Sequence, residues 1–269
     1  MKIDGKGIAS NILQTLADKV TFLKQKGIIP TLAVILVGDD PASLAYIKQK
    51  QKAADTIGAT VVFSHQSSDI RPEKLQEIIT IFNSDKNIHG VIIQRPVPLK
   101  NIHPILHSVF LSKDVDGFLP NSPFAVPVAL AVEEILKNAK CQMPNAKFVI
   151  IGRGETAGKP IADYLIKLGC APTVIHSHTP NPKELMKTAD IIISCVGKER
   201  IVTSDDIKKG AILISVGIWR DTEGKLYGDY DEKDIEHIAS FYTPTPKGVG
   251  PVNVACLMQN LVIAANNSH

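Results

Sequence analysis

Short apolar runs alternate with amphipathic stretches along most of the chain. The apolar runs have the length of buried strands and lie at residues 32–37, 59–63, 89–93, 147–151, 173–175, 190–196 and 211–216. Apolar residues recur at helical spacing over 6–26, 41–58, 72–82, 128–138, 160–168 and 252–265. This alternation predicts right-handed βαβ units, and hence an α/β fold with mostly parallel sheets. Residues 225–230 predict a further short edge strand and turn.

A proline-rich segment divides the chain into two predicted domains. Residues 119–127 contain three prolines and no regular apolar pattern, so we place the domain boundary there. The terminal helix, 252–265, is apolar enough to pack back on the first half. We therefore expect one domain of residues 1–122 plus 251–269, and a second of residues 123–250.

Composition narrows the class of protein. The 269 residues are 44% hydrophobic and 21% charged, with a formal net charge of +3, which is ordinary for a soluble protein. Scattered lysines argue against a nucleic-acid partner, although the mild basic excess suits anionic small molecules. No apolar run reaches the roughly 18 residues that span a bilayer, and no signal-peptide pattern is present, so we expect a cytoplasmic protein with no membrane partner. The four cysteines are far apart, which makes a disulfide framework or a zinc site unexpected.

The helix after the first predicted strand carries the first candidate chemistry. Asp40 is placed to cap it and Pro41 to begin it. Ser43, Tyr46 and Lys50 are three and four residues apart, so they share one helix face. A desolvated lysine can act as a base near neutral pH, and an adjacent tyrosine can tune it. The alternative is that Tyr46 packs on a neighbour and Lys50 is a solvated surface charge.

Two further polar groups follow the third predicted strand. Gln94 ends that strand, and Pro96 and Pro98 hold the next residues in an extended loop. The carboxyl ends of strands in open α/β sheets are where ligands bind. Asp114 and Asp116 lie beyond it, and two interpretations remain open for them. They could form a turn, or they could recognise a ring that carries adjacent N–H donors.

The second half begins with a strand, a glycine-rich turn and a helix. This arrangement cradles a pyrophosphate, because glycines allow close approach and the helix N-terminus offers free N–H groups. The glycines, Gly152, Gly154 and Gly158, have a spacing one residue longer than the common dinucleotide fingerprint. Two later strands also end in glycine, at Gly197 and at Gly217 before Ile218, where a cofactor ring would need close backbone approach.

The strand at 173–175 bears on the choice of dinucleotide. NAD sites usually have an acidic residue at this strand end, but the sequence continues with His176, Ser177 and His178. Arg153 and Ser177 could hold a 2′-phosphate instead, which favours NADP over NAD. The two histidines could also bind a metal or cap the strand; with no acidic or thiol group beside them in the sequence, we expect no metal site.

Taken in order, these motifs resemble the bifunctional methylenetetrahydrofolate dehydrogenase/cyclohydrolase family. The matching segments are Val37-Gly38-Asp39-Asp40-Pro41-Ala42-Ser43 with Tyr46 and Lys50, Gln94-Arg95-Pro96-Val97-Pro98, Lys113-Asp114-Val115-Asp116-Gly117-Phe118, Gly152-Arg153 with Gly158-Lys159-Pro160, Ala189-Asp190-Ile191-Ile192 and Gly248-Val249-Gly250-Pro251. The match covers nearly the whole length.

The resemblance implies a cytosolic homodimeric enzyme of one-carbon metabolism. It would use NADP to oxidise 5,10-methylenetetrahydrofolate to the methenyl form and then hydrolyse that product to 10-formyltetrahydrofolate. The implied architecture is an N-terminal α/β catalytic domain and a Rossmann-like NAD(P)-binding domain, with the folate cleft between them. The implied partners are tetrahydrofolate substrates, with neither a metal nor a nucleic acid.

The resemblance also implies roles for individual residues. Lys50 would be the central catalytic residue, supported by Gln94, and Tyr46 would line the folate site. Asp116 would bind the pterin ring through two hydrogen bonds. The residues implied for substrate binding near the C-terminus are Gly250 and Pro251, and those implied for cofactor binding are Gly152, Arg153, Gly154, Gly158, Ser177, Gly197, Gly217 and Ile218.

The sequence departs from the family pattern mainly on the cofactor side. The family usually has serine at Gly154 and aspartate at Ser215, and its closing loop differs from residues 246–253 here. Two alternatives therefore stay open. One is an enzyme with only one efficient activity, in which cyclohydrolase is retained and dehydrogenase is weak. The other is a non-catalytic folate- or dinucleotide-binding protein, against which the retention of Lys50 argues, because binding alone does not need that amine.

Overall fold

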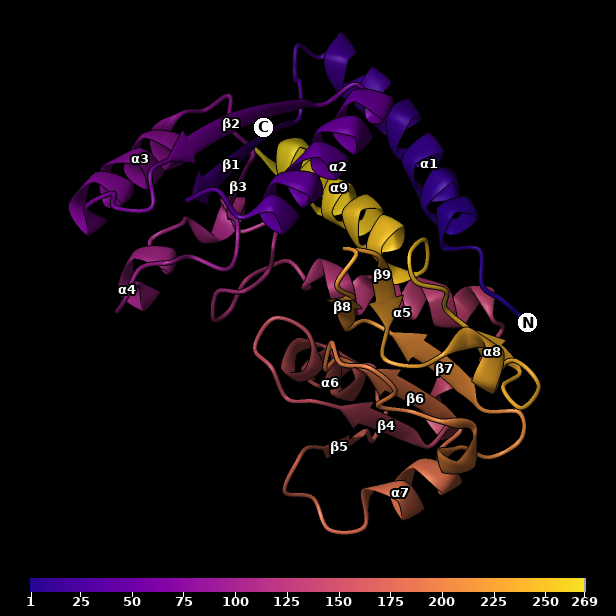
Figure 1. Cartoon of the computed structure of the whole chain (residues 1–269). Coiled ribbons are helices and arrows are strands. Elements are labelled where there is room, and N and C mark those ends of the chain that lie inside the picture. Colours follow the sequence, from indigo (N-terminus) through magenta and orange to yellow (C-terminus); the bar gives the residue numbers. More distant parts are fainter. Residues whose placement is uncertain (269) are drawn as a thin grey trace. The chain divides into compact units, whose positions relative to one another are not determined.

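The computed structural model describes residues 1–268 and divides the chain into two compact units (Figure 1). One unit contains Ser10–Pro127 and the C-terminal residues from Val254 onward. The other contains Met1–Ala9 and Val128–Asn253. We call them the Lys50 unit and the Gly152 unit, after the candidate site residue that each contains.

These units differ from the expected domains at their edges. The first nine residues lie in the Gly152 unit, because the N-terminal segment pairs with Tyr242: the amide of Ile3 donates to the Tyr242 carbonyl at 2.9 Å, and the Tyr242 amide donates to the Met1 carbonyl at 3.1 Å. The other two boundaries fall a few residues later than expected, inside helices that continue from one unit into the other.

A three-stranded parallel sheet organises the Lys50 unit, with strand order β2-β1-β3. Its elements are α1 (Gly5–Gln25, which begins in the other unit), β1 (Thr31–Val37), α2 (Pro41–Ile57), β2 (Thr60–Gln66), α3 (Pro72–Ser84), β3 (Gly90–Ile93), α4 (His103–Leu106) and a 3₁₀ turn at Leu111–Lys113. Every residue of β1 is buried, as expected for a central parallel strand covered on both faces. The predicted parallel α/β arrangement is confirmed.

The terminal helix α9 (Val249–Asn267) supplies part of this unit's core. Its buried apolar residues that join β1, α1 and α2 in one cluster are Val254, Leu257, Met258, Leu261, Val262, Ala264 and Ala265. The prediction that this helix packs back on the first half is therefore confirmed. By length and composition α9 could also cross a membrane, but 67% of its most apolar window is buried inside the structure, as in the core helix of a water-soluble protein.

The Gly152 unit contains a five-stranded parallel sheet with order β10-β7-β6-β4-β5. Its elements are α5 (Pro127–Asn138), a 3₁₀ turn at Met143–Asn145, β4 (Phe148–Ile151), α6 (Gly158–Lys167), β5 (Thr173–Ile175), α7 (Pro182–Thr188), β6 (Ile191–Ser194), a 3₁₀ turn at Ser204–Asp206, β7 (Ile212–Ser215), β8 (Ile218–Arg220), β9 (Leu226–Gly228), α8 (Glu232–Ile235) and β10 (Phe241–Tyr242). The helices between successive strands of this sheet, α6 and α7, are visible in Figure 1.

The prediction for residues 225–230 needs correction. The segment forms β9, but β9 does not join the edge of the main sheet; it pairs antiparallel with β8 in a separate two-stranded hairpin. The two edge strands of the main sheet are β5 and β10, and β10 pairs with β7 through only Phe241 and Tyr242. A strand of two residues is too short to produce an alternating pattern, so the sequence gives no sign of it.

The buried amide of Asn260 gives a test of the Lys50 unit. Its Nδ2 donates to the carbonyls of Val115 and Ala125, at 2.8 and 2.9 Å, and so ties α9 to the loop that carries the aspartates. Replacing Asn260 by Leu leaves both buried carbonyls without this donor, so we expect a loss of about 1–3 kcal/mol in the free energy of unfolding. Urea titration measures the change, with Asn266→Leu on an exposed position of the same helix as the control. Equal stability of the two variants would contradict the assigned role.

Candidate functional site

Helix α2 positions Lys50. The helix begins as predicted, with the Asp40 carboxylate accepting a hydrogen bond from the Ser43 amide at 2.8 Å and Pro41 in the first turn. It ends at Gly58, whose φ of 76° is left-handed. Lys50 is only 6% exposed, and its Nζ donates to Oε1 of Gln94 at 2.9 Å. The interpretation of Lys50 as a solvated helix charge is therefore wrong.

Strand β3 and its loop position Gln94. The backbone amide of Gln94 donates to the Ile35 carbonyl at 2.8 Å, which continues the sheet by one residue beyond β3. Its side-chain Nε2 donates to the Arg95 carbonyl at 3.0 Å. Because that bond occupies the amide nitrogen, the amide oxygen is the group that faces Lys50. Two elements far apart in the sequence thus bring together the lysine and glutamine that the sequence singled out.

The two aspartates after β3 have different roles. Asp114 is buried and shapes the loop: its Oδ2 accepts from the Leu119 amide at 2.9 Å, and its carbonyl accepts from the Gly117 amide at 2.9 Å. The turn-forming interpretation thus holds for Asp114. Asp116 is partly buried and interacts electrostatically with Lys50, and its recognition of a ring stays a prediction.

Burial and charge perturb both ionisable groups of this cluster. Burial lowers the pKa of Lys50, and the Asp116 carboxylate opposes that change. Burial raises the pKa of Asp116, while the charges of Lys50 and Arg95 oppose that change. The Arg95 guanidinium also lies 4.5 Å from the centre of the Phe118 ring. Opposed shifts of this kind in two neighbouring ionisable groups are typical of a candidate proton-transfer site.

For Tyr46 the structure shows the packing interpretation that the sequence left open. It lies one turn before Lys50 on α2 and is partly buried, with its ring packed against the apolar core of the Lys50 unit. Packing of this kind holds the ring in place without preventing contact with a ligand. Its predicted contact with folate stays a prediction.

The glycine-rich turn joins β4 to α6 as predicted. Gly152 has a φ of 99°, which favours glycine. A Cβ on Gly158 would lie 2.1 Å from the Gly152 carbonyl oxygen, so the start of α6 approaches the end of β4 as closely as only glycine allows. These residues fit a pyrophosphate cradle at a helix N-terminus. Gly154 has open space around its Cα, so the fold itself would accept a side chain there.

Arg153 and Ser177 follow neighbouring strands. Ile151 of β4 pairs with Ile175 of β5, so the residues after both strands emerge at the same edge of the sheet. Both side chains are exposed. Arg153 and Ser177 are thus exposed at the same sheet edge, and their contact with a cofactor 2′-phosphate stays a prediction.

The two histidines around Ser177 belong to a turn. The His176 amide donates to Thr179 Oγ1 at 2.9 Å, and the His178 amide donates to Nδ1 of His176 at 3.2 Å. This favours the strand-capping interpretation of the histidines. No three histidine, cysteine or acidic side chains gather as a metal site anywhere in residues 1–268.

Gly197 and Gly217 lie side by side in the loops after β6 and β7. Gly197 has a φ of 71°, and a Cβ on it would lie 2.9 Å from the Ile218 carbonyl oxygen. A Cβ on Gly217 would lie 2.3 Å from the Gly197 amide nitrogen. Two predicted cofactor residues are therefore in backbone contact. Ile218 opens β8 and is 51% exposed, and its predicted contact with the cofactor stays a prediction.

Sequence reasoning missed Asp229, which lies beneath these loops. It is fully buried, and its carboxylate binds Ser194 and two loop amides. The sequence signal was weak, because a single aspartate after a three-residue strand resembles an ordinary turn former.

Gly250 and Pro251, predicted to bind substrate, lie in the first turn of α9 and belong to the Gly152 unit.

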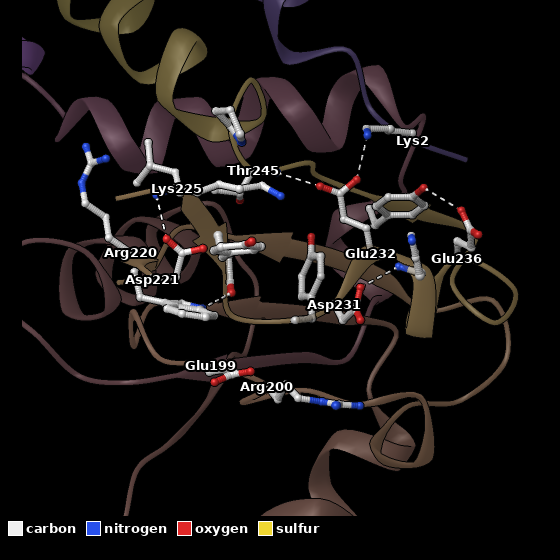
Figure 2. Close-up of a pocket in the computed structure, with 18 of the residues that line it drawn as sticks. Lys2, Glu199, Arg200, Arg220, Asp221, Lys225, Asp231, Glu232, Glu236 and Thr245 are labelled. Carbon is white, nitrogen blue, oxygen red and sulfur yellow. Dashed lines mark hydrogen bonds and ion pairs between the residues drawn. The ribbon is translucent and has the colours of Figure 1, made fainter. Parts of the chain in front are cut away.

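A separate hollow of ≈ 1060 Å³ lies around the β8–β9 hairpin (Figure 2). Its wall includes Trp219 and Tyr227, whose rings stack at 4.9 Å, and several paired charges such as Lys2 with Glu232 at 2.7 Å. None of the predicted site residues lines it. We therefore assign it no role in the predicted chemistry.

Comparison with known proteins supports the resemblance found in the sequence. Residues 3–116 match the catalytic domain of tetrahydrofolate dehydrogenase/cyclohydrolase, and residues 127–269 match its NAD(P)-binding domain. The bifunctional protein FolD of Staphylococcus carnosus is 37% identical over 97% of this chain and 95% of its own length. FolD of Lactococcus lactis subsp. cremoris is 38% identical over 98% of this chain and 96% of its own length.

Solved structures agree over the whole chain. The bifunctional FolD methylenetetrahydrofolate dehydrogenase/cyclohydrolase of Campylobacter jejuni aligns with a TM-score of 0.95 and 37% identity, covering 99% of both chains. The Trypanosoma brucei enzyme, solved with NADP and an inhibitor, aligns with a TM-score of 0.94 and 29% identity, covering 100% of this chain and 98% of that one. With matched models for both halves and relatives aligned from end to end, this chain belongs to the tetrahydrofolate dehydrogenase/cyclohydrolase family.

Proposed function

We propose that this chain is a bifunctional folate enzyme that catalyses two consecutive reactions. It oxidises 5,10-methylenetetrahydrofolate with NADP to 5,10-methenyltetrahydrofolate, and it hydrolyses that product to 10-formyltetrahydrofolate. Family membership supports both activities. The observation that carries the proposal is the buried Lys50 amine, hydrogen-bonded to Gln94 and electrostatically coupled to Asp116.

The folate side of the reaction uses the residues of the Lys50 unit. The Asp116 carboxylate accepts two N–H bonds from the pterin ring, a charge-assisted contact that fixes both position and orientation. Tyr46 lines the space beside the ring. Gln94 directs the Lys50 amine through the 2.9 Å hydrogen bond.

The hydrolysis needs water delivered to an electrophilic carbon. Water adds its oxygen to the methenyl carbon, the bond from that carbon to N5 breaks, and N5 takes up one proton while a second is released. Lys50 is the group that moves these protons, because burial lowers its pKa from the ordinary lysine value. Gln94 can only position the amine, because a side-chain amide does not titrate.

The oxidation needs mainly positioning, since the substrate carbon and the nicotinamide must approach to about 3 to 3.5 Å. When bound, NADP accepts the hydride from the substrate. The Gly152–Gly158 turn holds the pyrophosphate, and Arg153 with Ser177 holds the 2′-phosphate. The other contacts that we propose are Gly154, Gly197, Gly217 and Ile218 with the cofactor, and Gly250 and Pro251 with the substrate.

Assembly and cellular location complete the proposal. The protein is a cytoplasmic homodimer that acts on folate cofactors of one-carbon metabolism. Exposed apolar side chains on the edge strand β2, Val62 and Phe63, are consistent with a self-associating protein. Light scattering coupled to size-exclusion chromatography measures the mass of the assembly.

Substitution of Lys50 tests the proposed chemistry. Lys50→Met removes the proton-transferring amine, and Lys50→Arg keeps the charge but cannot lose its proton, so both should lower cyclohydrolase kcat at least about 10²-fold. NADP binding should be unchanged, because its proposed residues lie in the other unit. Hydrolysis of methenyltetrahydrofolate, followed by absorbance, measures the effect, with the exposed Lys48→Met as control. Near-normal hydrolysis by either Lys50 variant would contradict the assignment.

Substitution of Asp116 tests pterin recognition. Asp116→Asn converts a charged acceptor into a neutral amide and should raise KM for both folate substrates about tenfold or more. Because the pKa of Asp116 is raised, the wild-type enzyme has its ionised carboxylate above that pKa and loses it as the pH falls. Folate affinity should therefore weaken toward acid pH in the wild type but much less in Asp116→Asn. An unchanged KM in this variant, measured beside the exposed control Asp55→Asn, would exclude the role.

Cofactor choice tests the Gly152 unit and separates the alternatives. Methylenetetrahydrofolate oxidation should be faster with NADP than with NAD, and Arg153→Ala should raise KM for NADP about tenfold or more with little change for NAD. The exposed Arg200→Ala in the same unit is the control. If the chain oxidises the substrate with neither dinucleotide but has normal cyclohydrolase activity, the enzyme with one efficient activity is favoured. If it has neither dehydrogenase nor cyclohydrolase activity, the binding protein is favoured.

A further inference from the structure

A fully buried carboxylate, that of Asp229, lies directly under the loop that follows β6. Its Oδ2 accepts from the Ser194 hydroxyl at 2.6 Å and from the Val196 amide at 3.1 Å. Its Oδ1 accepts from the Lys198 amide at 2.9 Å. The three donors flank Gly197 in the chain, so one carboxylate fixes the loop on both sides of that glycine. A buried carboxylate that receives this many donors holds its surroundings in one geometry.

The same aspartate also fixes the loop after β7. Its own amide donates to the Ser215 hydroxyl at 2.9 Å, and that hydroxyl donates to the Gly217 carbonyl at 3.0 Å. A Cβ on Gly217 would lie 2.3 Å from Oδ2 of Asp229. One residue from a third segment thus bonds to both loops: its carboxylate binds the loop that carries Gly197, and its backbone amide binds Ser215 beside Gly217. Ser215 stands where the family usually has an aspartate, and here it relays the contact.

We propose that Asp229 is a positioning residue for the dinucleotide. It holds the two glycine loops at the separation that lets their backbones approach the cofactor, without touching the cofactor itself. The inference rests on the proposed function, in which Gly197 and Gly217 contact NADP. Loss of the carboxylate would leave the amides of Val196 and Lys198 without an acceptor, and the loop that carries Gly197 would shift relative to the loop that carries Gly217.

The variant Asp229→Asn tests whether this carboxylate positions the cofactor loops or only occupies volume in the core. The amide has nearly the same shape, but one of its two ends is a donor, which must face the amide of either Val196 or Lys198. KM for NADP should rise about tenfold or more, with a smaller change in dehydrogenase kcat. Cyclohydrolase activity should stay within about twofold of wild type, because its proposed proton-transfer residues, Lys50 and Gln94, belong to the Lys50 unit. The control is Asp205→Asn, the same change at an exposed position of the Gly152 unit.

The single tryptophan provides a structural readout that does not depend on activity. Trp219 Nε1 donates to the carbonyl of Gly228, the residue before Asp229, at 2.9 Å. Its fluorescence therefore reports whether the β8–β9 hairpin keeps its place. An unchanged emission spectrum in Asp229→Asn, together with a raised KM for NADP, separates altered cofactor loops from loss of the hairpin.

Ser194→Ala gives a second, milder test in case Asp229→Asn does not fold. It removes one donor to the carboxylate and leaves both loop amides bound, so KM for NADP should rise about twofold to fivefold. An unchanged KM for NADP in a folded Asp229→Asn overturns the inference. If Asp229→Asn does not fold, an unchanged KM for NADP in Ser194→Ala overturns it. Either result leaves the proposed function standing. A wild-type chain that neither binds nor uses NADP overturns the proposed cofactor site and this inference with it.

Discussion

The hydrogen bond between the Lys50 amine and the Gln94 amide oxygen, at 2.9 Å, is the contact on which the proposed chemistry depends. A lysine that is 6% exposed loses most of its hydration, which disfavours its charged form and makes its proton available. The fold has to hold this amine in place against that cost. The buried strand β1, the capped helix α2 and the end of β3 together provide the rigid frame.

Both units carry candidate ligand-binding groups, but one unit uses polar side chains and the other uses glycine backbone. In the Lys50 unit, Lys50 and Gln94 are joined by a hydrogen bond and Asp116 interacts with Lys50 electrostatically, which is the cluster that we propose for proton transfer. In the Gly152 unit, glycines at the carboxyl ends of strands leave the backbone open, and the buried Asp229 keeps those loops in register. In both cases the ligand-facing geometry is set by a group that is removed from water, where hydrogen bonds are stronger and less easily exchanged.

Much of this could be predicted from the sequence, because its signals are local. Continuous apolar runs predicted the buried parallel strands, Asp40 and Pro41 predicted the start of α2, and the glycines predicted the tight turn between β4 and α6. The sequence could not place Asp229, or pair the first residues with Tyr242, because both depend on contacts between distant segments. It also could not separate Asp114 from Asp116: the two differ in partners supplied by the folded loop and by α2 rather than in their spacing.

The most direct test of the central claim is the proton affinity of Lys50 itself. NMR of lysine side chains, with the signal assigned by its absence in Lys50→Met, follows the amine through a pH titration. The account predicts that Lys50 loses its proton clearly below the ordinary lysine pKa of about 10.4, because burial lowers its pKa. A Lys50 that titrates at or above that ordinary value would contradict the claim that burial prepares this amine for proton transfer.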